Sequence, residues 1–353
     1  ILFNRFNIVF YSENKSYQKY FMPLIKQLKN EKIKVIYISS DINDQIIEEN
    51  FQNIYVGREL FLTLAFALIR AKKVIFTATD LGNNRLIKNK TVDQYIYLFH
   101  AAVSVHRAYT KKAFNNYDLI FCNGQYQINE LRKIEEVYNL NKKKLVESGY
   151  LFFDYVRENY YLENKFKNHI LIAPSWNYAD KNFFNNCLFE LIQILIKLKK
   201  KVTLRPHNEH FYRYKNEIIE IESNFKSSEY FCLDVNDDNL KSMQSSDFLI
   251  TDNSGIAIEY FAIFKRPVMY FDEYPKIHNE SFRDINLNYI EEQIKHSFGY
   301  SCKKKDISIL DKKIIEMTTT FSQKKPLLDE YFKKNFYNFG NSAKVYLNEI
   351  LDK

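Results

Sequence analysis

The sequence contains little cysteine, and its four cysteines lie far apart. None of them forms a C-x-x-C pair or has a histidine at the spacing of a zinc ligand; they are Cys122, Cys187, Cys232 and Cys302. This pattern excludes a disulfide framework and fits a protein of a reducing compartment. We therefore expect no metal site and no other cofactor.

Long apolar runs are also missing. The longest, LFLTLAFALI at Leu60–Ile69, has ten residues and lies between Arg58 and Arg70. A helix needs about 20 apolar residues to cross a bilayer, so we interpret this run as a buried helix of a globular domain. We predict no transmembrane span and no signal peptide.

Positive charge exceeds negative charge, with a formal net charge of +8 and lysine clusters at 142–144, 199–201 and 303–305. Such clusters suit an anionic membrane surface, a nucleic acid or a phosphorylated substrate, and the alternative is an ordinary solvated surface. Because no zinc finger, RNA-binding signature or other nucleic-acid motif accompanies them, we predict no nucleic-acid partner.

The chain does contain a regular alternation of strand and helix patterns. Phe6–Tyr11 and Ile33–Ser39 have the composition of strands, and Tyr17–Leu28 between them has apolar residues at helical spacing. The same cycle continues to about residue 272. Strands that alternate with helices pair in parallel, so the sequence predicts open α/β sheets.

The alternation lapses in the charged and polar segment from Asp154 to His169, which we interpret as an interdomain linker. With 353 residues, 46% of them hydrophobic, the chain is long enough for two separate cores. We predict an N-terminal domain over residues 1–158, a C-terminal domain over 166–325 and closing helices over 326–353.

Polar residues directly follow several predicted strands. Open α/β sheets bind ligands beyond the carboxyl ends of their strands, so these residues are candidates for a site in a cleft between the domains. His100 follows YIYLF, Ser175 and Trp176 follow ILIAP, Arg205 and His207 follow KVTL, and Asp252, Asn253, Ser254 and Gly255 follow FLIT.

Two of these segments combine groups that bind phosphate. In RPH, Arg205 suits bidentate contact with phosphate oxygens, and His207 can donate to a phosphate or a leaving oxygen. The alternative for this tripeptide is a surface turn. In TDNSG, Gly255 permits close approach of the backbone, and Ser254 either caps the next helix or donates its hydroxyl to a phosphate.

The other candidates have two interpretations each. Asp252 either accepts from a ligand hydroxyl or orients its loop, and Glu259, one turn into the next helix, either accepts from a ribose hydroxyl or faces solvent. His100 is either a general base or a satisfied core histidine. Trp176, the only tryptophan, either stacks on a base or packs in the core.

Three segments occur together in the order of one known family. APSW (173–176), RPH (205–207) and SDFLITDNSGIAIEYFAIFKRPVMYFD (246–272) resemble the signature motifs of the CDP-glycerol glycerophosphotransferase family, which includes teichoic acid primases and polymerases. That family typically shows A-P-T-W-R, R-P-H-P and S-D-x-L-I-T-D-Y-S-S. Residues 117–154 are similar to the family's stretch that ends in G-Y-P-R-N-D.

The chain also departs from the family's motifs. The H-G motif falls on His100 and Ala101, so alanine replaces its glycine. The other departures are Leu151, Phe152, Asn177, Asn208, Asn253 and Gly255. These differences bear on the donor more than on the fold. TDNSG is also similar to the T-D-S-G-G of nucleotide-sugar epimerases and related glycosyltransferases, which share the two-domain GT-B architecture.

The resemblance implies two Rossmann-like α/β domains facing a central cleft, with the acceptor on the N-terminal side and a nucleotide-activated donor on the C-terminal side. It implies that His100 and His207 are catalytic, with His100 as the base for the acceptor hydroxyl. The implied donor contacts come from Arg205, Asn253, Ser254 and Gly255 to the diphosphate, and from Ser175, Trp176, Asp252 and Glu259 to the nucleoside. Cations and a helix terminus stabilise such phosphates without a metal.

The first hypothesis is therefore a transferase that moves glycerol phosphate or a related polyol phosphate from a CDP-activated donor to a cell-surface polymer or lipid-linked acceptor, releasing CMP. The alternative is a GT-B glycosyltransferase that uses a nucleotide sugar in capsule or lipopolysaccharide synthesis. A second alternative, motivated by Ala101 and Asn177, is a non-catalytic nucleotide-binding homologue. We expect a cytoplasmic protein on the inner face of the bacterial membrane, with an anionic membrane surface as a further partner.

Overall fold

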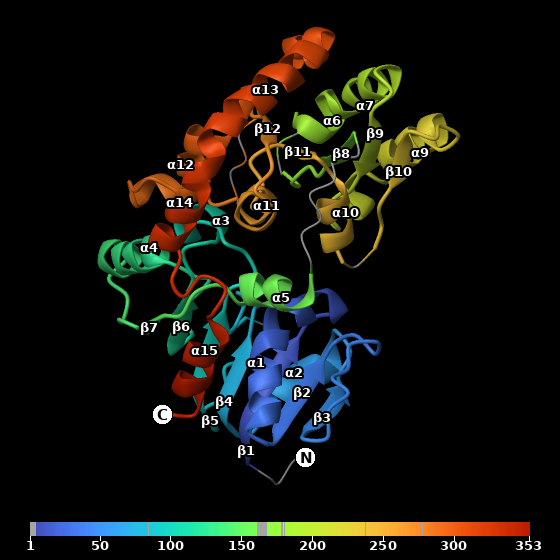
Figure 1. Ribbon diagram of the computed structural model, residues 1–353. Helices are drawn as coiled ribbons and strands as arrows, with labels where there is room; N and C mark the ends of the chain where they lie inside the picture. Colours follow the sequence, from blue (N-terminus) through green and yellow to red (C-terminus); the bar gives the residue numbers. More distant parts are fainter. Residues whose placement is uncertain are drawn as a thin grey trace. The chain divides into compact units, whose positions relative to one another are not determined.

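The chain folds into two α/β units, each built on its own parallel sheet (Figure 1). The structure, a computed structural model, describes residues 5–83, 85–160, 168–177, 179, 181–236, 238–274, 276 and 278–353. The first unit contains the residues up to Tyr160 together with Ser281–Leu287 and Lys333–Lys353, and the second contains the rest. The α/β class predicted from the alternating pattern is confirmed.

The first sheet has seven parallel strands in the order β3-β2-β1-β4-β5-β6-β7. Its inner strands are almost entirely buried, as expected for a parallel sheet that is covered on both faces. The order reverses between β1 and β4. The strands are β1 (Phe6–Ser12), β2 (Val35–Ser39), β3 (Phe51–Tyr55), β4 (Ala71–Phe76), β5 (Val92–Leu98), β6 (Leu119–Cys122) and β7 (Lys144–Glu147).

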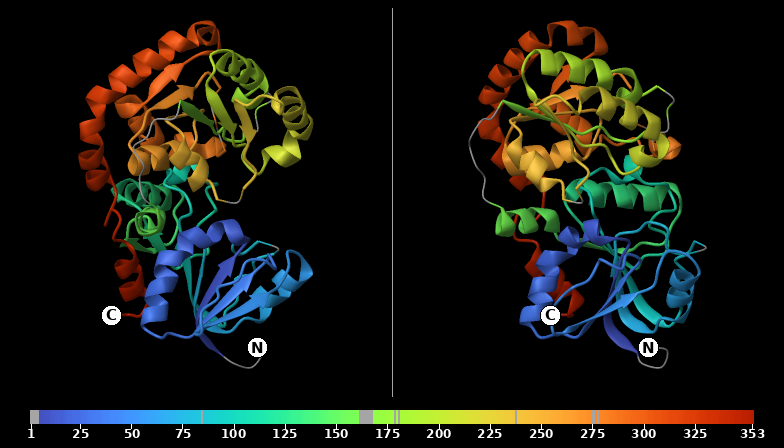
Figure 2. Two further views of the ribbon diagram at one scale, coloured as in Figure 1. Left: turned by 45° about the vertical axis from the view of Figure 1, so that its right-hand side comes forward. Right: turned by 90° about the vertical axis from the view of Figure 1, so that its right-hand side faces the viewer.

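Helices cover both faces of this sheet, and α1 and α15 lie side by side on one of them (Figure 2). One core lies beneath α2, α3 and α4, and the other beneath α1, α5 and α15. The bounds are α1 (Gln18–Asn30), α2 (Leu60–Leu68), α3 (Val105–Ala108), α4 (Gln125–Val137), α5 (Leu151–Asn159) and α15 (Ala343–Ile350).

The second sheet has six parallel strands in the order β10-β9-β8-β11-β12-β13. Its order reverses between β8 and β11, whose residues are all buried. The strands are β8 (His169–Ile172), β9 (Lys201–Leu204), β10 (Phe231–Leu233), β11 (Phe248–Thr251), β12 (Val268–Phe271) and β13 (Tyr300–Cys302).

The second sheet packs against α6, α7, α9 and α13 through one hydrophobic core, while α10 and α11 also contact its strands. No helix among the described residues has the length and apolar character needed to span a bilayer. The bounds are α6 (Phe183–Asn186), α7 (Leu188–Lys197), α8 (His210–Arg213), α9 (Lys215–Phe225), α10 (Leu240–Ser245), α11 (Ile256–Phe264), α12 (Ile290–Phe298), α13 (Leu310–Lys324) and α14 (Leu328–Asn335).

The predicted linker and domain limits differ from the structure in two ways. Helix α5 continues through the start of the predicted linker to Asn159, because Phe153 and Val156 are buried; residues 161–167 of that linker lie outside the described residues. Residues 281–287 and 333–353 belong to the first unit, because α15 packs on the first sheet and Ile285 joins its core. The other predicted domain limits remain predictions.

The interpretation of Leu60–Ile69 as a buried helix is wrong. In α2 only Leu62 and Phe66 are buried, whereas Leu60, Phe61, Leu64 and Leu68 are 66, 72, 43 and 50% exposed. A helix lying on the outside of a sheet presents a single stripe to the core. Because α2 is apolar on all sides, its sequence does not show which stripe that is.

Two predicted helices are each divided. The helix expected from about Asn182 to Leu198 is interrupted at Cys187, where φ is −124° and ψ is −26°. The helix expected around Tyr212–Ile221 lies mostly in α9, and Tyr214 separates it from the short α8. Apolar residues on each side of both breaks reach the core, and the breaks carry no clear signal in the sequence.

The end of β7 and the start of α15 are held together by a glycine and a buried carboxylate. Gly149 has φ +91°, and a Cβ there would lie 2.2 Å from the carbonyl oxygen of Tyr337, so no other residue fits. The Tyr346 hydroxyl donates to the Gly149 carbonyl at 2.9 Å. Asp154 accepts from the Ala343 N–H at 2.7 Å, at the N-terminus of α15. This contact gives a structural role to the aspartate that matches the last residue of G-Y-P-R-N-D.

Burial raises the pKa of Asp154 to about 6, although hydrogen bonds from Ala343 and Ser342 oppose the shift. The folded pKa exceeds the unfolded value of about 3.9, so the contribution of this group to stability is complete below about pH 4 and is lost as the pH rises through 6. We expect Asp154→Asn to remove that loss and to raise the free energy of unfolding at pH 7.5 by about 3 kcal/mol.

Urea unfolding between pH 4 and pH 8 measures this difference. Asp352→Asn, at a residue 81% exposed just after α15, is the matched control and should leave the pH dependence unchanged. Parallel curves for wild type and Asp154→Asn across the whole range would contradict the prediction.

Candidate functional site in the second unit and the His100 loop

The predicted site residues of the second unit gather at the carboxyl edge of its sheet. Because β8 and β11 are neighbours at the reversal of strand order, the loops that follow them start side by side. These loops carry Ser175 and Trp176 after β8, and Asp252 to Gly255 after β11. The loop after β9, with Arg205 and His207, starts at the same edge. Such a reversal is where open α/β sheets bind ligands.

A buried carboxylate joins the first two loops. Asp252 accepts hydrogen bonds from the Ser175 N–H at 2.8 Å and from the Ser175 hydroxyl at 2.7 Å. Burial raises the pKa of Asp252, while Lys276 and the two Ser175 hydrogen bonds oppose that shift. The loop-orienting interpretation of Asp252 is therefore realised in the structure, and Ser175 is its partner.

Helix α11 begins at Ile256, at the end of the loop that starts with Asp252. The Asp252 carbonyl accepts from the Ser254 N–H at 2.9 Å, and the Ser254 carbonyl accepts from Ala257 at 3.2 Å. Gly255 occupies the N-cap position and no side chain caps the helix, so the first of the two interpretations of Ser254, a helix cap, is not realised, and its contact with a phosphate remains a prediction. An uncapped first turn presents backbone N–H groups to an anion.

Glu259 lies in α11 and is 6% exposed, which excludes the interpretation that it faces solvent. Its neighbours along the helix are buried as well, because α11 is packed on all sides. A nucleoside contact by Glu259 remains a prediction.

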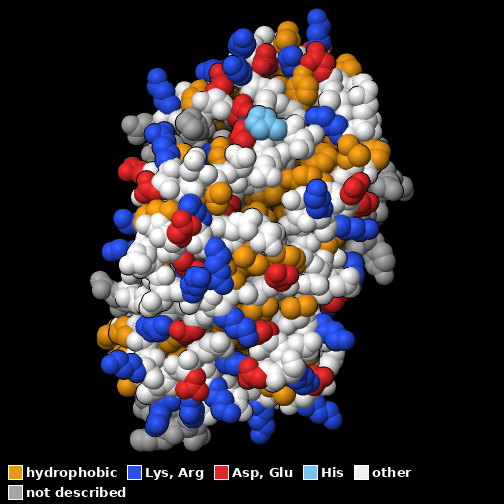
Figure 3. Space-filling model, turned by 90° about the vertical axis from the view of Figure 1, so that its left-hand side faces the viewer, with side chains coloured by type: hydrophobic (Ala, Val, Ile, Leu, Met, Phe, Trp, Pro, Cys, Tyr) orange, Lys and Arg blue, Asp and Glu red, His pale blue; other side chains and the backbone are white. Residues whose placement is uncertain are grey.

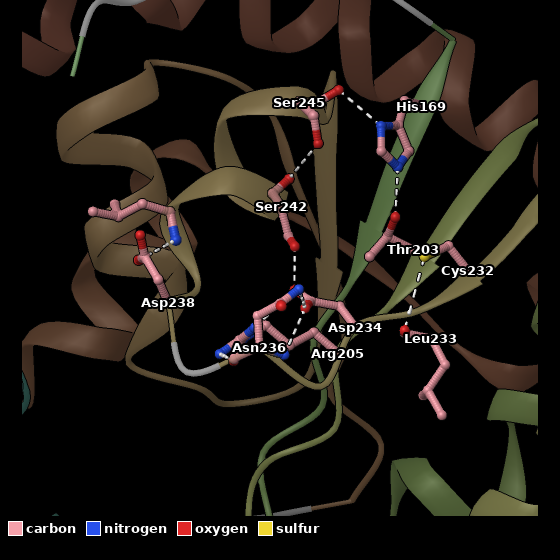
Figure 4. A network of polar contacts seen from close by, with 11 residues as sticks. His169, Thr203, Arg205, Cys232, Leu233, Asp234, Asn236, Asp238, Ser242 and Ser245 are labelled. Carbon is pink, nitrogen blue, oxygen red and sulfur yellow. Dashed lines mark hydrogen bonds and ion pairs between the residues drawn. The ribbon is translucent and has the colours of Figure 1, made fainter. Parts of the chain in front are cut away.

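The guanidinium of Arg205 is already paired. It donates to Asp234 at 2.7 Å and to the Asn236 carbonyl at 2.7 Å (Figure 4). Asp234 also accepts from the Ser242 hydroxyl. Burial acts to raise the pKa of Asp234, but hydrogen bonds from Ser242 and Asn236 and the Arg205 charge lower it overall. Arg205 thus fixes the loop after β10, and a phosphate contact through its remaining N–H groups stays a prediction.

His207 is exposed and next to a buried histidine. Its Nδ1 accepts from the Glu209 N–H at 3.2 Å, so the neutral ring carries its proton on Nε2 and donates from that side. The His207 N–H donates to Nδ1 of His210 at 3.0 Å. His210 stacks on Phe184, and burial followed by the His207 charge lowers the pKa of His210 to about 3. His210 stays neutral and supports the turn that carries His207.

Trp176 is surrounded by cationic and imidazole groups. Its ring lies 4.2 Å from the ring of His278 and 6.3 Å from that of His207, measured between centroids. The Arg213 guanidinium lies 5.1 Å from the Trp176 ring centroid, within reach of a cation–π contact. His278 and Arg213 were missed in the sequence because neither belongs to a recognisable motif.

In the first unit, His100 lies beyond the end of β5 in an aromatic setting. Its ring contacts Tyr17 edge-on at 5.3 Å and Tyr20 at 6.1 Å. Burial, with a smaller effect of Lys19, lowers the pKa of His100 to about 4, so the imidazole is neutral at physiological pH. A neutral imidazole is the form that accepts a proton.

Buried side chains of β6 and α4 hold the loop that follows His100. Asn123 donates to the Ala101 carbonyl at 3.2 Å and Gln127 to the Val103 carbonyl at 3.1 Å. Glu130 accepts from the Val105 N–H and lies 3.3 Å from Nδ1 of His106. These positioning residues were not predicted, because their role depends on packing and not on spacing.

The comparisons with known proteins bear on the whole chain. Residues 1–344 match the model of the CDP-glycerol:poly(glycerophosphate) glycerophosphotransferase family. The chain belongs to this family. The resemblance seen in APSW, RPH and TDNSG is thereby confirmed. A search of curated protein sequences finds no match.

Solved structures share the fold of this family member. The wall teichoic acid polymerase TagF matches with a TM-score of 0.66 at 18% identity, over 98% of this chain and 88% of that chain. UDP-GlcNAc 2-epimerase from Methanocaldococcus jannaschii matches with a TM-score of 0.60 at 13% identity, over 99% of this chain and 100% of that chain. A glycosyltransferase from Rickettsia africae matches with a TM-score of 0.54 at 14% identity, over 99% of this chain and 98% of that chain. At these identities the likeness establishes the two-domain Rossmann-like fold alone.

Among the residues that the structure describes, this glycerophosphotransferase family member has no group of three or more His, Cys, Asp or Glu side chains arranged to hold a metal ion.

The link between Ser175 and Asp252 gives a testable consequence for the site. Ser175→Ala removes one hydrogen bond and should lower the free energy of unfolding by about 1 kcal/mol. Asp252→Ala removes both acceptor oxygens and leaves the Ser175 N–H without its partner, so it should lower the free energy of unfolding by more than Ser175→Ala does. Thermal unfolding measures both changes.

Ser301→Ala, which removes an exposed hydroxyl bonded to Asp272 at 3.0 Å, is the matched control and should have little effect. Equal effects of all three substitutions would show that the link does not organise the two loops.

Proposed function

We propose that this chain transfers glycerol phosphate, or a related polyol phosphate, from a CDP-activated donor to a polymer acceptor and releases CMP. Family membership supports the reaction class and the nucleotide-activated donor. The observation that carries the site assignment is the gathering of the family's motif residues at one edge of the second sheet, around the uncapped N-terminus of α11.

The donor's diphosphate is proposed to lie at the first turn of α11. There the backbone N–H groups, the Ser254 hydroxyl and Nε2 of His207 supply hydrogen bonds, and Asn253 and Arg205 add to them. Negative charge builds on the CMP leaving group as its bond to the glycerol-bearing phosphorus breaks. Donors fixed before the reaction stabilise that charge without reorganisation. Trp176 and Glu259 are the proposed nucleoside contacts.

The acceptor hydroxyl is proposed to lose its proton to His100 while its oxygen attacks the same phosphorus. The neutral imidazole in its aromatic setting has the correct protonation state for this step. The acceptor oxygen gains the bond to phosphorus, and the electron pair of the broken bond leaves with CMP. His100 returns the proton to solvent afterwards.

The position of the only tryptophan allows donor binding to be measured directly. We expect CDP-glycerol to change the emission of Trp176, and CMP to be released when a glycerol phosphate oligomer is added. His207→Ala and Ser254→Ala should weaken donor binding about tenfold. His100→Ala should keep donor binding and lower kcat about 100-fold.

Trp176→Phe, which removes the signal, controls for the origin of the emission change. Unchanged rates and donor affinities in the three alanine variants would overturn the site assignment. A response to UDP-sugars or CMP-sugars and not to CDP-glycerol would favour a glycosyltransferase, and binding without turnover would favour a non-catalytic homologue.

We further propose that the protein works in the cytoplasm on the inner face of the cell membrane, where a lipid-linked acceptor would lie. The lysine clusters support this weakly, because Lys143 lies beside Glu135, Lys144 pairs with Glu349 and Lys200 donates to Asn168. On the face drawn in Figure 3, Lys and Arg side chains are interspersed with Asp and Glu side chains and do not form one basic patch.

Helix α2 supports the membrane proposal better. The exposed side chains Leu60, Phe61, Leu64 and Leu68 form an apolar face on it, which we name the α2 face. Arg58 and Arg70 flank the helix and are exposed. An apolar helix face with arginines at its margins fits an anionic bilayer surface, since the side chains enter the headgroup boundary while the arginines meet the lipid phosphates.

Replacing Phe61 and Leu64 together by Asp should reduce co-sedimentation with phosphatidylglycerol vesicles at least tenfold, because the α2 face then carries charge of the wrong sign. Leu327→Asp, at a leucine 57% exposed in the second unit, is the control and should leave binding unchanged. Equal binding by the double variant and wild type would overturn this use of α2.

A further inference from the structure

The reversal point of the first sheet carries polar side chains that the proposed function does not use. It lies between β1 and β4. Glu13 follows β1, Thr77 follows β4, and His100 follows the next strand, β5. None of the family's motifs noted in the sequence includes Glu13 or Thr77. Open α/β sheets bind ligands at such a point, so these groups are candidates for contacts with a ligand.

Thr77 has a buried hydroxyl that no protein group satisfies. The residue is 1% exposed, and its Oγ1 has no hydrogen-bond partner among the described residues. Leaving such a hydroxyl unsatisfied costs about 1–3 kcal/mol. By strand alternation Thr77 lies on the face of Ile75, which packs in the core under α1. The imidazole of His100 contacts the Thr77 backbone.

Glu13 belongs to the same group of side chains through Tyr17. The Tyr17 hydroxyl donates to the Glu13 carboxylate, and its ring contacts His100 at 5.3 Å. Burial raises the pKa of Glu13, Asp80 adds to that shift, and Arg58 opposes it. A carboxylate kept largely out of water is a strong acceptor for ligand hydroxyls.

A positive charge lies on the His100 side of this group. Lys19 acts on His100, and its Nζ lies 5.3 Å from the ring centroids of Tyr20 and Phe152. The group thus combines a hydroxyl without a partner, a half-buried carboxylate, a neutral imidazole and a nearby ammonium. Such a combination of groups suits a ligand that carries adjacent hydroxyls, which the carboxylate and the hydroxyl would bind, next to a phosphodiester, which the ammonium would face.

We propose that Glu13 and Thr77 bind the polyol end of the acceptor beside His100. The inference rests on the proposed function and names its acceptor class as a chain end with neighbouring hydroxyls, such as a terminal polyol phosphate. Glu13 accepts a hydrogen bond from one hydroxyl of the acceptor, and the Thr77 hydroxyl forms a hydrogen bond with the neighbouring one. The terminal hydroxyl is then held where His100 takes its proton.

Thr77→Val provides the sharpest test, because it keeps the shape of the side chain and removes only the unsatisfied hydroxyl. We expect its unfolding midpoint to be unchanged or higher than that of wild type. With a short glycerol phosphate oligomer as acceptor, its KM for the acceptor should rise about tenfold. The KM for CDP-glycerol and the emission response of Trp176 should be unchanged.

Glu13→Gln should raise the acceptor KM in the same way, and Glu31→Gln is its matched control. Glu31 is an exposed acid of the same unit that pairs with Lys353 at 2.6 Å, and its substitution should leave both KM values unchanged. Acceptor KM values equal to wild type in both Thr77→Val and Glu13→Gln would overturn the acceptor site. A wild-type protein that neither binds CDP-glycerol nor releases CMP would instead overturn the proposed function.

Discussion

The two hydrogen bonds that Asp252 accepts from Ser175 join the loops that form the carboxyl edge of the second sheet. At the reversal of strand order these loops follow β8 and β11, whose ends are also joined by the hydrogen bond from the Thr251 hydroxyl to the Ala173 carbonyl at 2.6 Å. The Asp252 carbonyl also accepts from the Ser254 N–H, just before α11 begins. The cost of burying this carboxylate is offset by those bonds and by Lys276.

The cations of this edge are less available than their sequence suggests. Arg205 is held by Asp234, and His210 is buried and neutral. The anion recognition that we propose therefore relies mainly on backbone N–H groups of α11 and on the donor side of His207. This division makes chemical sense, because helix N–H groups are fixed in direction while long cationic side chains are not.

The first unit has the same kind of reversal point, for which we propose a different ligand. This point presents a half-buried carboxylate and a buried hydroxyl, which favour ligand hydroxyl groups over phosphates. Hydrogen bonds with the side chains of Asn123, Gln127 and Glu130 hold the backbone of the loop that follows His100. Arg58 acts on Glu13 and lies two residues before Leu60, the first residue of the α2 face. The proposed membrane contact and the proposed acceptor site are thus adjacent within one unit.

The sequence by itself determined the α/β class, the two-unit organisation and the family. Alternating strand and helix patterns follow from burial, which acts on each segment locally, and the motifs APSW, RPH and TDNSG are contiguous. Only the tertiary structure decided which residues meet. Ser175 and Asp252 are 77 positions apart, Thr77 and Glu13 come from different strands, and α2 is apolar on every side. Partners and exposed faces arise from the order of strands in a sheet, which local periodicity does not encode.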